Sequence, residues 1–550
     1  MSNEIPKENI LLSIAQKLKV VLSYRYMKGA LWGIGGVLVG LPVALLIFLL
    51  LAPEPTRYGL KAEQFAGNRE DTSTSLEHTP NANAPNIVFI LADDLGYGDV
   101  EAFGETPIRT PNLNRLAAEG VRFTDFYAPA PVCSPSRVGY LTGRYPLRTG
   151  MSFPIQPGHN PSLQTWAVSR ARAWMSALGA ADMKSGDNLT NGLPLHEITI
   201  AEGLKQAGYA TGVVGKWHLG DFNWWPEYHP FNHGFDFFVG FNASNDDWPV
   251  AFYRGTEKEI DDIGLNQQQY TQLFTTEAVG FIEQNQEKPF FLFLSHKDPH
   301  QPFFPSDKFI DRSEAGRYGD AVEELDASVG TILDTLDRLS LSDNTVVIFA
   351  SDNGPWYEGD AGGLRGRKGT SNEGGYRVPF LLRYPEHLEA GSTHAGPAMG
   401  IDLLPSLFSM AGVSLPKDRI IDGRSLFDSN NRLIEKGEAR ELYFAAGLDF
   451  EAVRRGDLKY IQRNSGYVWP LPLDKPIGLV DAMAPRYVPV DGEPVDQLNS
   501  WPKLYNLDID AAEAYDISDA HPDDVSDLDG VLQNWRKKFV ANPTGFQRSK

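Results

Sequence analysis

The sequence predicts an α/β protein: a large mixed, mostly parallel sheet covered by helices on both faces, then a small antiparallel sheet with a helix, and before both a transmembrane helix. Short apolar runs that end in polar residues alternate with helical patterns up to about residue 425. Shorter strand-like runs follow, and 25 uncharged residues stand near the N-terminus. Strands that alternate with helices form mostly parallel sheets covered on both faces.

The uncharged N-terminal stretch is Gly29–Pro53, rich in Leu, Val, Ile, Gly and Ala. As a helix it would be roughly 37 Å long, enough to cross a hydrocarbon core of about 30 Å. A cleaved signal peptide is the alternative, but the preceding region is long and the stretch has no A-x-A site. Three bases precede the span closely and two follow it, which places the segment 1–28 in the cytoplasm. We therefore predict an uncleaved anchor at 29–53.

Residues 54–85 are rich in Pro, Asn, Ser and Thr, a composition typical of a disordered stalk. The rest of the chain would stand outside the cytoplasm, on a periplasmic or extracellular face. A single cysteine excludes intramolecular disulfides, which favours a bacterial periplasm. We expect a main domain over 86–425 and a smaller C-terminal subdomain over 426–550.

Four apolar runs of the main domain end abruptly in polar residues: NIVFILADDLGYGD, ATGVVGKWHLG, PFFLFLSHKDPH and TVVIFASDNGP. Each is typical of a buried strand followed by a loop. In sheets of this class ligands bind beyond the carboxyl ends of the strands. The polar residues at these four ends are therefore expected to converge on one site.

Helical patterns lie between the strands, for example Asn112–Gly120 and His196–Gly208, each closed by glycine. After residue 425 the runs ELYFAAG, DLKYIQR and PKLYNLDID predict a small antiparallel sheet. A terminal helix is expected over Val525–Phe539.

Cys133 lies in PVCSPSRVGYLTGRYP. Pro135 suits a first helical turn, so the sulfur would lie near the positive end of a helix. Free cysteines are more often small buried hydrophobic residues. On cysteine usage alone the structural interpretation is preferred.

The wider string changes that preference. Its motifs are CSPSR followed by LTGR, together with LADDLGYGD, GKWHLG, HGFDFFVG, SDNGP, RKGTSNEGGYRVP and LYNL. Through these motifs the chain resembles the type I sulfatases, the formylglycine-dependent arylsulfatase family of the alkaline phosphatase superfamily. The resemblance implies an alkaline-phosphatase-like fold and a sulfuric ester hydrolase whose Cys133 is converted to formylglycine by a maturation enzyme. The stretch 151–196 is longer than the family pattern leads us to expect.

A hydrated aldehyde at position 133 would carry two hydroxyls on one carbon. One attacks sulfur and displaces the alcohol, and the other loses a proton so that the aldehyde reforms and sulfate leaves. A serine could perform only the first half.

This chemistry requires a hard divalent cation held by oxygen ligands. One such ion is expected, with Ca²⁺ implied by the family and Mg²⁺ as the alternative. Its predicted ligands are Asp93, Asp94, Cys133 as formylglycine, Asp352 and Asn353.

Three predicted catalytic residues surround the nucleophile. Arg137 lies four residues after Cys133, on the same helix face, where its guanidinium could hold the hydrate oxygens or the sulfate. Lys216 and His218 are one residue apart, so on an extended segment they would point the same way. The resemblance implies that Lys216 contacts nucleophile and sulfate and that His218 accepts the proton that releases sulfate.

Two further residues, His300 and Lys368, match family positions that grip sulfate and assist the leaving oxygen. For His296 a structural role is preferred, because in HxxPH the second histidine fits the motif better.

Other functions are excluded or less favoured. The net charge of −21 argues against a nucleic-acid partner, and no stripe of Lys and Arg appears. The substrate is expected to be an aryl or carbohydrate sulfate ester. A phosphonate or phosphate ester hydrolase of the same superfamily is one alternative. The other is a catalytically silent, membrane-tethered protein that binds sulfated glycans.

Overall fold

The structure is a computed structural model, and it describes residues 65, 76–79, 81, 84–155, 188–247, 249–428, 430–434, 440–464 and 501–547. All of them belong to one unit of the chain, Thr56–Asn160 with Lys184–Lys550. The other unit, Met1–Pro55 with Pro161–Met183, lies outside the described residues, and so does the predicted span 29–53. None of the described helices combines the length and the apolar composition needed to cross a membrane.

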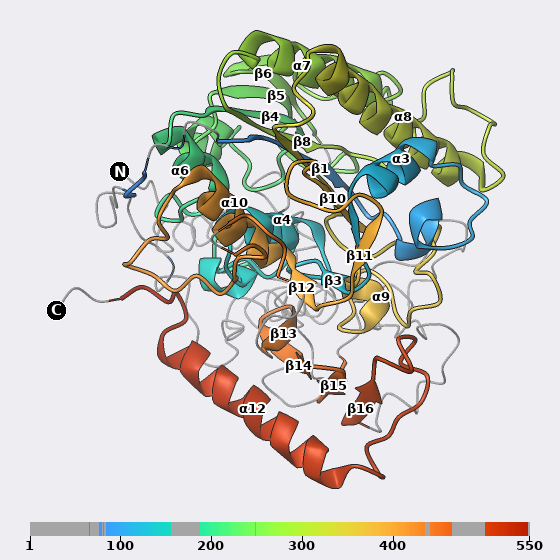
Figure 1. Cartoon of the computed structure of the whole chain (residues 1–550), viewed down its shortest axis with the longest axis vertical. Helices are drawn as coiled ribbons and strands as arrows, with labels where there is room; N and C mark the ends of the chain where they lie inside the picture. Colours follow the sequence, from blue (N-terminus) through green and yellow to red (C-terminus); the bar gives the residue numbers. More distant parts are fainter. Residues whose placement is uncertain are drawn as a thin grey trace, which may run out of the picture. The chain divides into compact units, whose positions relative to one another are not determined.

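A ten-stranded mixed sheet forms the centre of the described body (Figure 1). In spatial order its strands are β11 (Ser392–His394), β2 (Val121–Phe123), β10 (Phe380–Arg383), β9 (Thr345–Ser351), β1 (Asn86–Ala92), β8 (Phe290–Ser295), β4 (Ala210–Lys216), β5 (Phe237–Phe241), β6 (Phe252–Arg254) and β7 (Glu257–Ile260). The central strands β9, β1, β8, β4 and β5 pair in parallel. Strands β10, β6 and β7 pair with their neighbours antiparallel. The predicted mixed, mostly parallel sheet is confirmed.

Both faces of the sheet are buried, which explains the continuous apolar runs. All seven residues of β1 are buried. Because side chains alternate along a strand, Ile87, Phe89 and Leu91 enter one core while Val88 and Ile90 enter the other.

Helices cover each face, as predicted (Figure 1). One core takes side chains from α3 (Pro111–Glu119), α7 (Tyr270–Asn285) and α8 (Gly316–Arg338). The opposite core takes them from α4 (Cys133–Thr142), α6 (Ile200–Gln206) and α10 (Leu403–Ala411). The shorter helices are α9 (Glu373–Tyr376), η3 (Tyr97–Asp99), η4 (Glu101–Phe103), η5 (Pro146–Thr149), η6 (Pro226–Tyr228), η7 (Pro230–His233) and η8 (Gly400–Asp402).

One predicted helix is shorter than expected. The pattern His196–Gly208 predicts a start at His196, but α6 begins at Ile200. The Thr199 hydroxyl accepts the N–H of Glu202, and the Glu202 carboxylate accepts the N–H of Thr199. This capping box fixes Thr199 as the N-cap, so the helix begins after it and the preceding residues form a loop. The other predicted helix, Asn112–Gly120, is confirmed as α3.

Helix α4 is buried along its whole length and begins at Cys133. It ends at Gly143, which adopts the left-handed conformation at φ 68° that helix ends favour. A Cβ at Gly139 would lie 2.3 Å from Cβ of Pro129, so only glycine allows this close approach. The position of Cys133 is therefore set by a helix embedded in the core.

The small C-terminal sheet is also confirmed. Its antiparallel strands are β13 (Glu441–Ala446), β14 (Asp449–Arg455), β15 (Leu458–Ile461) and β16 (Lys503–Asn506). Helix α12 (Pro522–Ala541) packs on it through Leu528, Leu532 and Phe539, and it extends beyond the predicted helix at both ends. Tyr127 and Tyr376 of the main domain join this core. Tyr127 belongs to a two-stranded sheet of β3 (Phe126–Tyr127) and β12 (Ala398–Met399).

Part of the predicted stalk contacts the body and is not free there. Leu76 is buried in the core that contains α4, and Phe65 is 1% exposed. The N–H of Thr79 donates to the carbonyl of Gly412 at 2.9 Å, and His78 bridges to Val413. Among the described residues of this segment, Phe65 and Leu76 are buried, and His78 and Thr79 bond to the body through their backbone. The rest of the predicted stalk lies outside the described residues.

Candidate functional site

Two neighbouring strands bring the predicted metal ligands together. β1 and β9 run in parallel, so Asp93 and Asp94 leave the sheet at the same edge as Asp352 and Asn353. The N–H of Asp94 donates to Asp352 Oδ1 at 3.1 Å, and Asn353 Nδ2 donates to Asp94 Oδ1 at 2.7 Å. Asp94 holds a positive φ of 65°, a strained conformation for a residue with a side chain. The four side chains form one buried cluster.

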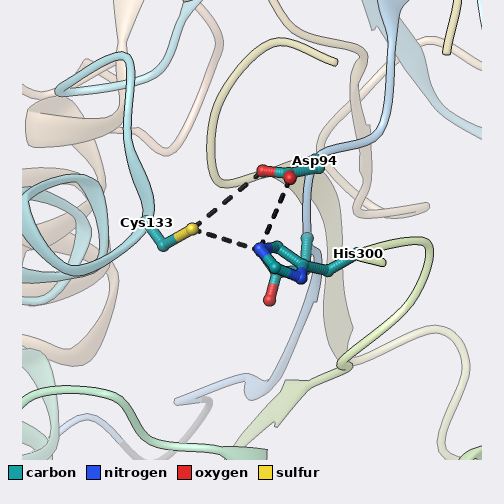
Figure 2. Close-up of side chains that lie close together, drawn as sticks. Asp94, Cys133 and His300 are labelled. Atoms are coloured by element: carbon teal, nitrogen blue, oxygen red, sulfur yellow. Dashed lines mark hydrogen bonds and ion pairs between the residues drawn. The ribbon is translucent and has the colours of Figure 1, made fainter. Parts of the chain in front are cut away.

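Cys133 points into this cluster from the first residue of α4. Its Sγ lies 3.5 Å from Asp93 Oδ1 and 4.0 Å from Asp94 Oδ1. Figure 2 shows the Asp94 carboxylate and the His300 ring turned toward the sulfur. Burial raises the pKa of the Cys133 thiol well above its usual range, although Lys216 and Lys368 oppose the shift. The thiol is therefore neutral and a poor nucleophile as it stands.

The ligand atoms fit a hard divalent cation. One atom each from Asp93, Asp94, Cys133 and His300 lies within 4.8 Å of the others. The buried Oδ1 of Asn353 has no hydrogen-bond partner among the described residues, as expected for an oxygen that faces a cation. The residues present therefore suit a Ca²⁺ or Mg²⁺ site.

The carboxylates also show the electrostatic strain that a cation would relieve. Burial and then the charge of Asp93 raise the pKa of Asp352 to about 7. Burial alone would raise the pKa of Asp93, but Lys216 and Arg137 outweigh it and hold that pKa well below its usual range. Three carboxylates face three basic side chains here, so a divalent ion would leave the site with a net charge of about +2, suited to an anion.

Arg137 lies one helical turn beyond Cys133, as predicted, but behind the carboxylates. Its Nη2 is 3.2 Å from Asp93 Oδ2 and 3.0 Å from Asp352 Oδ2. Its Nη1 donates to the carbonyl of Lys216 at 2.9 Å. The guanidinium is fully buried and is not among the residues that line the cavity described below. It positions the two carboxylates.

Lys216 and His218 do not share an extended segment, so that expectation is wrong. Strand β4 ends at Lys216, and His218 has a φ of 55°. Lys216 Nζ donates to Asp93 Oδ2 and, at 2.9 Å, to the hydroxyl of Ser244. His218 instead lines the cavity. The turn after the strand, and not strand alternation, directs the imidazole.

His218 is held in one tautomer. Its Nε2 lies 2.8 Å from the carbonyl of Ile155, which can only accept, so Nε2 carries a proton. The buried Nδ1 has no hydrogen-bond partner among the described residues and is left as an acceptor. Burial, then the charges of Lys216 and Arg137, lower the pKa of His218 well below its usual range. The ring is therefore a neutral base.

His300 and Lys368 stand on the open side of the cluster. Lys368 Nζ donates to Asp94 Oδ2 at 2.7 Å and lies 3.3 Å from Cys133 Sγ. His300 Nε2 is 3.5 Å from Asp94 Oδ2, while its Nδ1 is 2.6 Å from the carbonyl of Gln301. All the predicted site residues thus converge within one region.

His296 lies elsewhere, which supports the structural role predicted for it. Its Nε2 is 3.1 Å from the Ser328 hydroxyl of α8. Burial lowers the pKa of His296 to about 4, so its ring stays neutral within the core.

A cavity of about 130 Å³ opens onto the cluster. Besides the predicted site residues, it is lined by Pro154, Ser244, Asp246, Asp247, Gln301 and Trp356. None of these six is among the residues predicted from the sequence. A signal existed for three of them, because Ser244, Asp246 and Asp247 follow β5 as polar residues after an apolar run, the same pattern as at the four strand ends considered.

Comparisons with known proteins agree on one family. Residues 85–413 match the family model described as sulfatase. The chain is 32% identical over 474 residues to human steryl-sulfatase, covering 70% of this chain and 76% of that protein. It is 37% identical over 414 residues to N-acetylgalactosamine-6-sulfatase of Sus scrofa, covering 70% and 73%. A solved structure from work on glycosaminoglycan metabolism by Bacteroides thetaiotaomicron matches with a TM-score of 0.64 and 27% identity, covering 83% of this chain and 100% of that one.

Proposed function

Because this chain belongs to the type I sulfatase family of the alkaline phosphatase superfamily, we propose that it hydrolyses sulfate monoesters with a formylglycine made from Cys133 and one bound divalent cation. Hydrolysis of sulfate esters, aryl or carbohydrate, follows from the family. The modification and the cation rest on the chemistry of the site. A maturation enzyme is required as a partner, because Cys133 must be oxidised before the first turnover.

The observation that carries the proposal is the placement of the chain's only cysteine among two carboxylates and a lysine. The neutral thiol is not an activated nucleophile. A hydrated aldehyde at this carbon supplies one hydroxyl to attack sulfur and a second whose deprotonation expels sulfate. Neutral His218 lines the cavity, and its Nδ1 has no hydrogen-bond partner among the described residues, so it can accept that proton.

The remaining side chains hold the carboxylates in place and orient the sulfate. Arg137 and Lys216 fix Asp93 and Asp352 from behind. Lys368 and His300 line the cavity, where they can grip the sulfate and assist the leaving oxygen.

Asp93, Asp94, Asp352 and Asn353, with the modified residue 133, would hold the cation. When bound, it would neutralise the sulfate and activate a bound hydroxyl. Carboxylate and amide oxygens on several loops suit Ca²⁺, which tolerates irregular coordination better than Mg²⁺ does. We propose Ca²⁺, with Mg²⁺ as the alternative.

His218→Ala is expected to lower kcat for sulfate release by about 10²–10⁴-fold, because the base that takes the final proton is lost. The matched control is His296→Ala, another buried neutral histidine, which should lower the thermal midpoint more than kcat. Steady-state kinetics and thermal unfolding of both variants provide the measurement. If both variants lose kcat equally at a temperature where both are folded, His218 is not the base.

The protein should release sulfate from aryl and sugar sulfates faster than phosphate or phosphonate from matched esters. A sulfate monoester carries one negative charge and a phosphate monoester nearly two, so a single-cation site favours sulfate. Ion chromatography of the sulfate and phosphate released from a substrate panel decides between a sulfatase and a phosphate or phosphonate ester hydrolase. Equal or faster phosphonate cleavage would favour the rival hydrolase. No turnover of any sulfate ester by the modified, metal-loaded protein would favour the silent glycan-binding protein.

We also propose that the span 29–53 anchors the enzyme with its body outside the cytoplasm, in a periplasm or on an extracellular face. The uncharged length of the span and the excess of bases before it support this orientation. Protease added to spheroplasts should digest the body. Protection until the inner membrane is lysed would reverse the topology.

A further inference from the structure

Three cavity-lining side chains have no role in the proposed chemistry and are not fully buried. These are Asp246, Gln301 and Trp356. The Asp246 side chain is 32% exposed, against 9% for Lys368 and 2% for Asp94. The cavity is also smaller than the roughly 300–1,000 Å³ of typical small-molecule sites. The cavity would enclose the sulfate and leave the alcohol portion of the ester beside these three side chains.

Asp246 is held close to the site by a turn. The N–H of Asp247 donates to the carbonyl of Ser244 at 3.1 Å, and the N–H of Ser244 donates to Asp247 Oδ2 at 2.9 Å. The Ser244 hydroxyl accepts from Lys216 Nζ at 2.9 Å, which ties the turn to the catalytic cluster. This arrangement fixes a carboxylate beside the place where the alcohol portion would lie.

The Asp246 carboxylate is not committed to its basic neighbour. Its Oδ1 is 3.9 Å from His300 Nδ1, beyond hydrogen-bond distance. That Nδ1 already lies 2.6 Å from the carbonyl of Gln301. The Ser244 side chain hydrogen-bonds the Asp246 carboxylate, but a carboxylate has about four lone-pair sites. Asp246 can therefore accept further hydrogen bonds from a ligand.

A carboxylate in this place discriminates among sulfate esters. It accepts hydrogen bonds from hydroxyl or ammonium groups, which are stronger than bonds between neutral groups. It repels a second sulfate or a carboxylate on the same ligand, as does the net charge of −21 of the whole chain. A steroid or plain aryl group would cover it without supplying a donor, at a desolvation cost.

Trp356 supplies the apolar part of the same surface. Its ring is half-buried and lines the cavity, with Tyr357 edge-on at 4.6 Å between ring centroids and 38% exposed. An indole face can cover the C–H face of a sugar ring while the sugar hydroxyls turn toward a polar partner.

From Asp246 and Trp356 we infer that the enzyme selects a monosulfated sugar whose remaining groups are hydrogen-bond donors without further negative charge, and that Asp246 is the specificity-determining residue. This inference rests on the proposed function, because it assumes that the sulfate occupies the Cys133 cluster.

The test measures equilibrium binding in the Cys133→Ala background, so that no turnover is needed. The probes are a panel of monosulfated hexoses, including N-acetylgalactosamine 6-sulfate, each paired with its disulfated counterpart. The monosulfated member should bind at least about tenfold more tightly, in line with one charged hydrogen bond gained and one repulsion avoided. Adding Asp246→Asn should reduce the ratio of the two dissociation constants, disulfated over monosulfated, to within about threefold. Trp356→Leu should weaken both members and leave the ratio unchanged.

The control is Asp334→Asn on α8, which makes the same charge change at a side chain 75% exposed and away from the cavity lining. Its ratio should equal that of the parent. A ratio unchanged by Asp246→Asn, or tighter binding of the disulfated sugars in the parent, overturns the inference. Neither result bears on the formylglycine mechanism, which depends on turnover by the enzyme with Cys133 intact.

Discussion

Replacing Cys133 with alanine is expected to abolish turnover, with a loss of about 10⁶-fold, the size seen when a covalent nucleophile is removed. Cys133→Ser should be attacked at most once and then stall, because one hydroxyl leaves no second oxygen whose deprotonation expels sulfate. In active protein, mass spectrometry of the peptide containing residue 133 should find an aldehyde in place of the thiol. Sulfate release under steady-state and single-turnover conditions separates the two variants.

The matched control is Ser136→Ala, three residues further along the same buried helix. The Ser136 hydroxyl is buried and has no hydrogen-bond partner among the described residues, so its removal should leave both stability and turnover close to those of the parent. Steady turnover by Cys133→Ser at near the parent rate would refute the formylglycine mechanism, as would an unmodified thiol in fully active enzyme.

Removal of the divalent cation is expected to abolish activity and leave the fold largely intact. Elemental analysis of active enzyme should find about one ion per chain, and a chelator should remove the ion and the activity together. Ca²⁺ should restore activity better than Mg²⁺ at equal concentration, because the ligand set is irregular and rich in carboxylates. Active enzyme without any divalent ion would refute the metal centre.

Asp352→Asn tests directly whether Asp352 is a ligand of the divalent cation. It removes one ligand charge and keeps the shape, so metal content should fall and activity should drop by at least about 10²–10³-fold. Because the pKa of Asp352 is raised to about 7, its ionised form destabilises the metal-free fold near neutral pH. The variant should therefore not lower the thermal midpoint of metal-free protein. A large fall in that midpoint would mean that Asp352 acts mainly as the ionic partner of Arg137.

Much of the site could be predicted from the sequence, because strand ends are visible in it. Asp93 and Asp352 follow continuous apolar runs, and both strands are buried on both faces and pair in parallel. Parallel pairing then places the residues after the two runs at one edge of the sheet. The apolar run of β5 is likewise followed by polar residues, among them Ser244 and Asp246.

The sequence could not predict where side chains point beyond a strand end. Strand alternation predicts that His218 points the same way as Lys216, but the positive φ of His218 breaks that pattern. The predicted helix face of Arg137 is correct, yet its guanidinium lies behind the carboxylates instead of along the cavity. The start of α6 depended on a capping box within a pattern that looked helical from His196 onward.

The sequence alone determined the α/β fold, four central strands of the large sheet and the polar residues at their ends, because apolar periodicity and motif order are local properties. Only the tertiary structure decided which basic side chains hold the carboxylates from behind and which ring nitrogen of His218 has no hydrogen-bond partner among the described residues. It also decided that Asp246 and Trp356 line the cavity. These depend on loop conformations and on contacts between residues far apart in the chain, such as Arg137 with Asp352 and His218 with Ile155. Side-chain packing and hydrogen bonding, which no short window of sequence contains, set those conformations.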